Sequence, residues 1–242
     1  MLRTSPALWF LCETPCRWYW RLKLALEVRG EALPKGALLI AAKHASSFDI
    51  LLIGHITKVR DGRIPFFQMG SFEGYRFLGP VAPLLQKLGG FPVMRPKDVR
   101  RIAEKTGRRE EALQRMRTVN DAAEATRAQV LLKGGVLVVY PEGTRDGSAL
   151  RPFKSTLEVE SALRVHALGT PVHVQPVSIA YAPARWFRRR VLVEFGPAFV
   201  LADGMDAAGV LERVHSDIAS RWVNEEGMSA GGKPRAEREV NT

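Results

Sequence analysis

Residues 37–42 read ALLIAA, an apolar run in which apolar and polar positions do not alternate. A run of this length is typical of a strand that is buried on both faces, as the strands of parallel sheets are. Three further runs have a similar character: VLVVY at residues 136–140, residues 172–180, and VLVEF at residues 191–195. Helical patterns accompany the strands at residues 121–133 and 207–223. Strands that alternate with helices predict an α/β fold in which helices flank a mostly parallel central sheet.

The length and composition predict one folded domain. The chain has 242 residues, of which 46% are hydrophobic, and this is enough for one sizeable core. We expect the domain at residues 26–226, where it opens with an alternating strand from Leu26 to Gly30. A helical segment at residues 1–25 precedes it. Residues 227–242 are small and polar and are predicted to form a disordered tail.

The net charge of +11 indicates a negatively charged partner. Nucleic acid, an anionic membrane and an acidic carrier protein all satisfy this condition. The basic stretch from Arg95 to Arg117 lacks the interleaved aromatic residues that stacking on bases requires, so nucleic acid is not the expected partner. The two cysteines, Cys12 and Cys16, match neither a zinc pattern nor a disulfide framework, and we expect no metal site.

The N-terminal segment combines aromatic and basic side chains. They are Trp9, Phe10, Trp18, Tyr19 and Trp20, together with Arg17, Arg21 and Lys23. This mixture suits a membrane–water interface, and it also fits a helix that packs on the core. Trp186 and Phe187 lie among arginines and offer a second patch of the same kind. No stretch reaches the roughly 18 apolar residues of a spanning helix, so peripheral attachment at the cytoplasmic face of a membrane is expected.

Residues 43–49 read KHASSFD and place His44 five residues before Asp49. On a regular helix this spacing would set the two about 140° apart. They can meet if His44 lies in a strand-to-helix turn and Asp49 in the first helical turn, with Ser46 or Ser47 as the helix cap. Asp49 could then hold one imidazole nitrogen and leave the other free as a base. The pattern alone also fits a partly buried histidine beside a capping aspartate.

Two further motifs follow predicted strands. Residues 142–145 read EGTR and leave the run at residues 136–140, and ligands of open α/β sheets bind beyond the carboxyl ends of strands. Gly143 would let the backbone approach a ligand closely, and Arg145 presents a planar fork for phosphate. Residues 89–95 read GGFPVMR and supply a second arginine, Arg95. Taken singly, these motifs also fit an ordinary turn with a surface arginine and an edge strand beside a basic loop.

In this order and spacing, the motifs resemble those of the glycerolipid acyltransferase family, specifically the 1-acylglycerol-3-phosphate O-acyltransferases. The matches, spread over roughly Leu26 to Phe199, are His44 and Asp49 for H-x4-D, Gly89 and Arg95 for G-x-x-F-x-x-R, Glu142 to Arg145 for E-G-T-R, and Pro176 in an apolar strand. Three features depart from the family pattern. Pro92 occupies the usual phenylalanine position, the segment from Arg95 to Leu132 is longer than usual, and Thr156 stands where glycine is common.

The resemblance implies an enzyme that moves a fatty acyl group from a thioester of acyl-carrier protein or coenzyme A to the free hydroxyl of a lysophospholipid. The favoured acceptor is 1-acylglycerol 3-phosphate, which gives phosphatidic acid. Alternatives are another lysolipid, glycerol 3-phosphate, or a non-catalytic basic protein that binds a membrane or nucleic acid. His44 would be the base, Asp49 would orient it, and no cofactor or metal is implied. The substrate-binding residues would be Arg95, Glu142, Gly143, Thr144 and Arg145.

Overall fold

The centre of the fold is a mostly parallel sheet with the strand order β1-β7-β6-β2-β5-β3-β4, in which β8 pairs with β6. The computed structural model describes residues 4–70, 82–154, 157–183 and 188–223. The strands are Leu24–Gly30 (β1), Ala37–Ala42 (β2), Phe66–Gly70 (β3), Gly90–Val93 (β4), Val136–Val139 (β5), Val172–Tyr181 (β6), Arg189–Phe195 (β7) and Phe199–Val200 (β8). Strand β6 pairs antiparallel with β7 and β8, whereas all other pairs are parallel. The predicted α/β fold class is confirmed.

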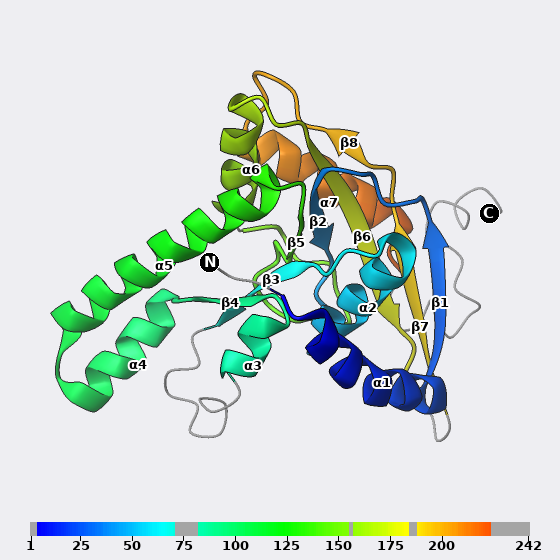
Figure 1. Ribbon diagram of the computed structural model, residues 1–242, viewed down its shortest axis with the longest axis horizontal. Coiled ribbons are helices and arrows are strands. Elements are labelled where there is room, and N and C mark those ends of the chain that lie inside the picture. The colour runs from blue at the N-terminus through cyan, green and yellow to red at the C-terminus, as the bar shows by residue number, and fades with distance from the viewer. Residues whose placement is uncertain (1–3, 71–81, 155–156, 184–187, 224–242) are drawn as a thin grey trace.

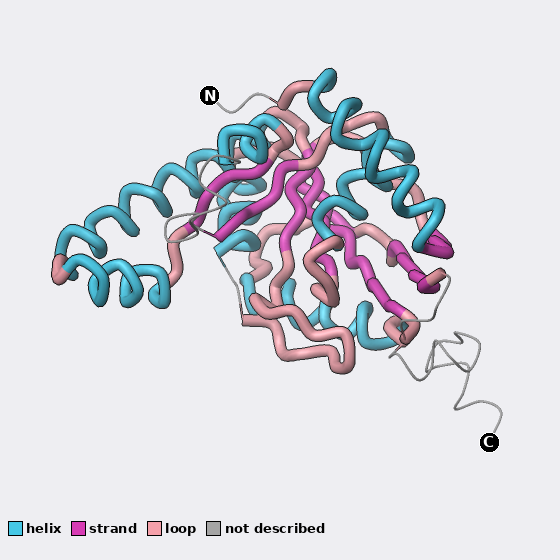
Figure 2. The backbone as a smooth tube through the Cα atoms, turned by 90° about the horizontal axis from the view of Figure 1, so that it is seen from below, coloured by secondary structure: helices cyan, strands magenta, loops and turns pink. Residues whose placement is uncertain are grey.

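Helices cover both faces of this sheet (Figures 1 and 2). The helices of the described residues are Pro6–Lys23 (α1), Asp49–Asp61 (α2), Ala82–Lys87 (α3), Pro96–Thr106 (α4), Arg109–Leu132 (α5), Leu157–Ala167 (α6) and Ala207–Arg221 (α7). Leu39 and Ala41 of β2 pack on the side of α5, α6 and α7, while Leu38 and Ile40 pack on the side of α2. Successive side chains of a strand point to opposite faces, and both faces of β2 are covered, so every position of the run is apolar.

Helix α1 packs against α2 along the lower edge of the view in Figure 1. The indole N–H of Trp9 donates to the carbonyl of Leu88 over 2.9 Å, and the ring of Trp9 lies directly over Gly54 of α2. Trp20 is 6% exposed and its ring contacts that of His55. Packing on the core, the alternative interpretation of this segment, is therefore observed. The outer face of α1 exposes large apolar side chains: Phe10, Leu11, Trp18, Tyr19 and Leu22.

Helices α4 and α5 form a hairpin that projects from the sheet (Figure 1). Val99 of α4 and Ala112 of α5 pack in a small apolar cluster together with Met94, Ile102, Leu113, Met116 and Val119. The predicted start of α5 at residue 121 is wrong, because apolar positions at helical spacing continue back to Ala112 among the charged residues. Glu110 and Glu111 occupy the first turn of α5, where the helix dipole favours negative charge.

Across the described ranges, no helix is both long and apolar enough to cross a membrane. The predicted tail at residues 227–242 and the aromatic pair Trp186 and Phe187 lie outside the described residues.

Candidate active site

The loop from β2 to α2 wraps around the carboxylate of Asp49. Oδ2 of Asp49 lies 2.9 Å from Nδ1 of His44 and accepts hydrogen bonds of 2.7 Å from the backbone N–H groups of Ala45 and Ser46. The predicted serine cap is wrong, because Phe48 is the N-cap residue and no side chain caps the helix. The loop N–H groups that point inward bind the Asp49 carboxylate, which also sits favourably at a helix N-terminus.

The second carboxylate oxygen of Asp49 is also occupied. The hydroxyl of Tyr181, the last residue of β6, donates to Oδ1 over 2.7 Å, and Asp49 is fully buried. Burial and the nearby charge of Asp49 raise the pKa of Tyr181, so the hydroxyl keeps its proton. Because a carboxylate only accepts hydrogen bonds, this network favours the His44 tautomer that carries its proton on Nδ1. Nε2 of His44 is then left with a lone pair.

The imidazole of His44 is held in one orientation by a second tyrosine. Tyr140, which follows β5, stacks on it with ring centroids 4.2 Å apart and an interplanar angle of 26°. Burial raises the pKa of the Tyr140 hydroxyl well above its usual range. A ring fixed by stacking and by a carboxylate is pre-organised to take a proton from a group that reaches Nε2.

A buried ion pair between Lys43 and Glu142 lies beneath this histidine. Nζ of Lys43 is 3.1 and 3.2 Å from the two carboxylate oxygens of Glu142, and neither side chain is exposed. Glu142 also accepts the backbone N–H groups of His44 and Arg151, each over 3.0 Å. Desolvation lowers the pKa of Lys43, and the charge of Glu142 opposes this shift. The sequence prediction did not include Lys43, although a lysine directly after a strand buried on both faces needs an acidic partner.

The rest of the EGTR motif faces outward beside the histidine loop. Gly143 has a φ of 67°, in the left-handed region that suits glycine, and Thr144 and Arg145 are exposed. The guanidinium of Arg145 donates to Oγ of Ser47. The backbone N–H of Asp146 donates to the carbonyl of His44 over 2.9 Å. The loops after β2 and β5 are therefore joined, and the exposed guanidinium of Arg145 is anchored to the loop that carries the His44–Asp49 pair.

Arg95 lies on the same edge of the sheet but farther along it. It is the exposed N-cap residue of α4, just beyond β4, and β5 and β3 separate β4 from β2. Three strand spacings amount to roughly 14 Å. In the part of the chain that the structure describes, no hydrogen bond or ion pair joins Arg95 to His44 or Arg145. Pro92 is accommodated because β4 is an edge strand, where a missing N–H is tolerated.

A histidine oriented by a buried carboxylate, at the carboxyl edge of a largely parallel sheet, has the geometry of a general-base catalyst. The family model described as Acyltransferase matches residues 25–180, and the chain belongs to this family of enzymes. The family resemblance read from the motifs is confirmed.

A crystal structure with a related fold is that of the 1-acyl-sn-glycerophosphate (LPA) acyltransferase PlsC from Thermotoga maritima. It is 16% identical in sequence, and the match covers 88% of this chain and 75% of that chain with a TM-score of 0.50. At this identity the likeness concerns the fold. No curated protein matches the chain in sequence.

Proposed function

We propose that this acyltransferase moves a fatty acyl group from an acyl thioester to the free hydroxyl of a lysophospholipid. The proposed acceptor is 1-acylglycerol 3-phosphate, and the product is phosphatidic acid. The donor is a thioester of acyl-carrier protein or coenzyme A. The observation that carries the proposal is the 2.9 Å contact between Asp49 and Nδ1 of His44, which leaves Nε2 as a base beside the exposed guanidinium of Arg145.

In the proposed reaction, Nε2 of His44 takes the proton of the acceptor hydroxyl as its oxygen attacks the thioester carbonyl. The tetrahedral intermediate collapses, the carbon–sulfur bond breaks, and the thiolate leaves with the proton from His44. Asp49 stabilises the imidazolium between these two steps, and its remaining hydrogen bonds keep it fixed. General-base assistance of this kind contributes about 10² to 10⁴ in rate.

The phosphate of the acceptor is assigned to the basic side chains at the carboxyl edge of the sheet, where His44 also lies. Arg145 lies beside Ser47 in the loop that carries His44, so a phosphate held there brings a neighbouring hydroxyl close to Nε2. Gly143 and Thr144 are exposed next to it and would shape the pocket. Glu142 contributes by holding the loop, since its carboxylate already accepts protein hydrogen bonds. Arg95, three strands farther along the edge, would contact a different phosphate from the one that Arg145 holds, on a substrate that spans the edge.

We further propose that the enzyme attaches peripherally to an anionic membrane, at its cytoplasmic face, through the outer face of α1. Trp18 is 65% exposed and Phe48, just before Asp49, is 49% exposed. The ring of Tyr19 stacks on that of Phe48 with centroids 6.2 Å apart, so the apolar surface of α1 continues to the entrance of the site. A lysolipid could therefore present its hydroxyl to His44 while its chain stays in the membrane.

An acceptor panel with isotopically labelled acyl donors, read by lipid mass spectrometry, tests the proposal. Product from 1-acylglycerol 3-phosphate is expected to exceed product from other lysolipids and from glycerol 3-phosphate. His44→Ala should lower turnover by about 10² or more, whereas His166→Ala on α6 serves as the matched control and should leave it unchanged. If His44→Ala keeps more than about a tenth of the wild-type turnover, the general-base role is wrong.

A further inference from the structure

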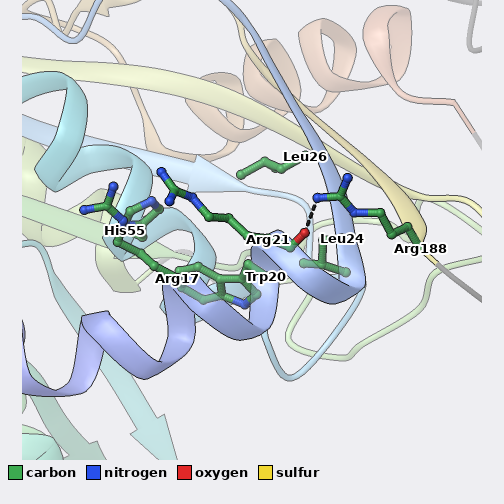
Figure 3. A pocket seen from close by; sticks show the side chains of 7 residues that line it. All are labelled: Arg17, Trp20, Arg21, Leu24, Leu26, His55 and Arg188. Carbon is green, nitrogen blue, oxygen red and sulfur yellow. Dashed lines mark hydrogen bonds between the residues drawn. The ribbon is translucent and has the colours of Figure 1, made fainter.

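A second candidate site lies away from His44, in a cavity of about 270 Å³ where α1, β1 and α2 meet (Figure 3). Its apolar wall consists of Trp20, Leu24 and Leu26. Strand β1 runs opposite to β2, so its first residues lie at the carboxyl edge of β2. The cavity therefore opens on the same edge of the sheet as the catalytic loop, yet it shares no lining residue with that loop.

Three guanidinium groups gather around this cavity without an acid among the lining residues. Arg17 and Arg21 come from successive turns of α1, and Arg188 directly precedes β7 (Figure 3). A guanidinium N–H of Arg188 donates to the carbonyl of Arg21 at the last turn of α1, which leaves its other N–H groups for a ligand. Within the described ranges none of the three side chains forms an ion pair. Like charges held together repel, and an anion between them removes the repulsion.

The acid best placed to neutralise these arginines is already engaged. Glu13 stands one helical turn before Arg17 on α1, the spacing at which side chains meet. Its carboxylate instead lies 2.7 Å from Nδ1 of His55 and accepts a hydrogen bond of 2.6 Å from Lys58. Burial raises the pKa of Glu13, but these hydrogen bonds outweigh that effect and hold the pKa below its usual value. With Nδ1 of His55 bound to Glu13, only Nε2 of this ring is left for a ligand in the cavity.

We propose that this cavity binds the phosphate group of an anionic phospholipid in the membrane surface, in addition to the acceptor at His44. Each guanidinium group is planar and can donate two parallel hydrogen bonds to a pair of phosphate oxygens. Three such groups around one cavity therefore suit a phosphate group. A lipid fits better than free phosphate because three of the seven lining residues, Trp20, Leu24 and Leu26, are apolar. In addition, Trp18 and Leu22 expose apolar surface on the same helix. This inference rests on the proposed attachment of α1 to a membrane.

Co-sedimentation of the full chain with vesicles tests the site without any turnover. Phosphatidylcholine vesicles with and without phosphatidate would be compared for the wild type, Arg21→Gln, Arg188→Gln and the control Lys23→Gln. Lys23 lies on the same turn as Arg21 but does not line the cavity. The loss of one surface charge should weaken binding at most about fivefold. The loss of a charge-assisted hydrogen bond in the cavity should weaken phosphatidate-dependent binding at least about tenfold.

The outcomes separate the cavity from simpler explanations. Equal losses for Arg21→Gln and Lys23→Gln would show diffuse attraction and overturn the site. Inorganic phosphate could raise the Tm of the wild type but not that of Arg21→Gln, while Arg21→Gln and Arg188→Gln bind vesicles as well as the wild type does. The site would then bind free phosphate, and the lipid assignment would be wrong. A wild type that binds neither kind of vesicle would contradict membrane attachment itself. His44→Ala should bind vesicles like the wild type, which separates this site from catalysis.

Discussion

The substitution Glu142→Gln tests whether the glutamate of the EGTR motif positions the histidine loop or contacts substrate. The carboxylate of Glu142 accepts four hydrogen bonds of 3.0 to 3.2 Å: two from Lys43 and one each from the backbone of His44 and Arg151. A glutamine amide can accept at only one of its two ends. Whichever way it turns, its NH₂ group faces an N–H donor of the protein, and Lys43 loses its buried counter-charge.

The magnitude follows from these contacts. Removing one partner of a buried ion pair costs about 3–5 kcal/mol, and a buried donor left unpaired costs about 1–3 kcal/mol on its own. Deprotonation of Lys43 limits the loss, so we expect about 4 kcal/mol. In a domain of this size that corresponds to a Tm lower by about 8–16 °C. Turnover should also fall, because the backbone of His44 loses its anchor.

Urea unfolding followed by tryptophan fluorescence measures the loss, with Glu124→Gln as the matched control. Glu124 pairs with Arg164 at the surface, so its substitution should cost less than about 1 kcal/mol. The double variant Lys43→Met/Glu142→Gln removes both buried charges and should lose less than the sum of its single variants. The pH response provides a further check. In Glu142→Gln the pKa of Lys43 falls further below its unfolded value of about 10. The loss of unfolding free energy relative to the wild type should therefore become smaller as pH rises toward that value.

A different result would refute the positioning role. If Glu142→Gln unfolds within about 0.5 kcal/mol of the wild type while the KM for the phosphorylated acceptor rises, Glu142 contacts the substrate. The reasoning from its four internal hydrogen bonds would then be wrong.

Three further predictions concern the phosphate fork, the N-terminal helix and pH. Arg145→Ala should raise the KM for phosphorylated acceptors roughly 10- to 100-fold with little change in thioester hydrolysis by water. Arg145→Lys should restore only part of this loss. An equal loss in acyl transfer and in thioester hydrolysis would indicate a folding role. Trp9→Ala should destabilise the fold by about 3–5 kcal/mol in urea unfolding, whereas Trp18→Ala should leave stability within about 0.5 kcal/mol and weaken vesicle co-sedimentation; the reverse pattern would contradict the orientation of α1. Burial, opposed by Glu13, lowers the pKa of His55 from its ordinary value of 6.5, so the folded state favours the neutral ring and stability falls as pH drops below 6.5. The lowered pKa of Glu13 adds a second loss of stability below pH 4.5. A pH titration of stability followed by tryptophan fluorescence that shows no decrease below pH 6.5 would contradict the role of His55.

The elements that the sequence predicted best are those whose surroundings constrain every residue. Strand β2 matches its predicted range, because both of its faces are buried and no polar side chain is tolerated. The start of α5 was missed because the hairpin of α4 and α5 projects into solvent and its few apolar positions stand among charged ones. The serine cap failed for a different reason. Local propensity favours serine at an N-cap, but the carboxylate of Asp49 satisfies the loop N–H groups instead.

The candidate site shows where local sequence information ends. Motif spacing identified His44 and Asp49, since a loop only a few residues long joins them. The residues that fix this pair come from elsewhere: Tyr140 and Glu142 follow β5, and Tyr181 ends β6. Both strands are direct neighbours of β2, so parallel pairing brings their carboxyl ends to His44, although Glu142 is 98 residues away from His44 in sequence and Tyr181 is 132 residues away from Asp49. The strand order was needed to see this, and no local pattern encodes it. The meeting of His44 and Asp49 is thus readable from one loop, whereas the contacts that hold this pair in place depend on which strands lie beside that loop.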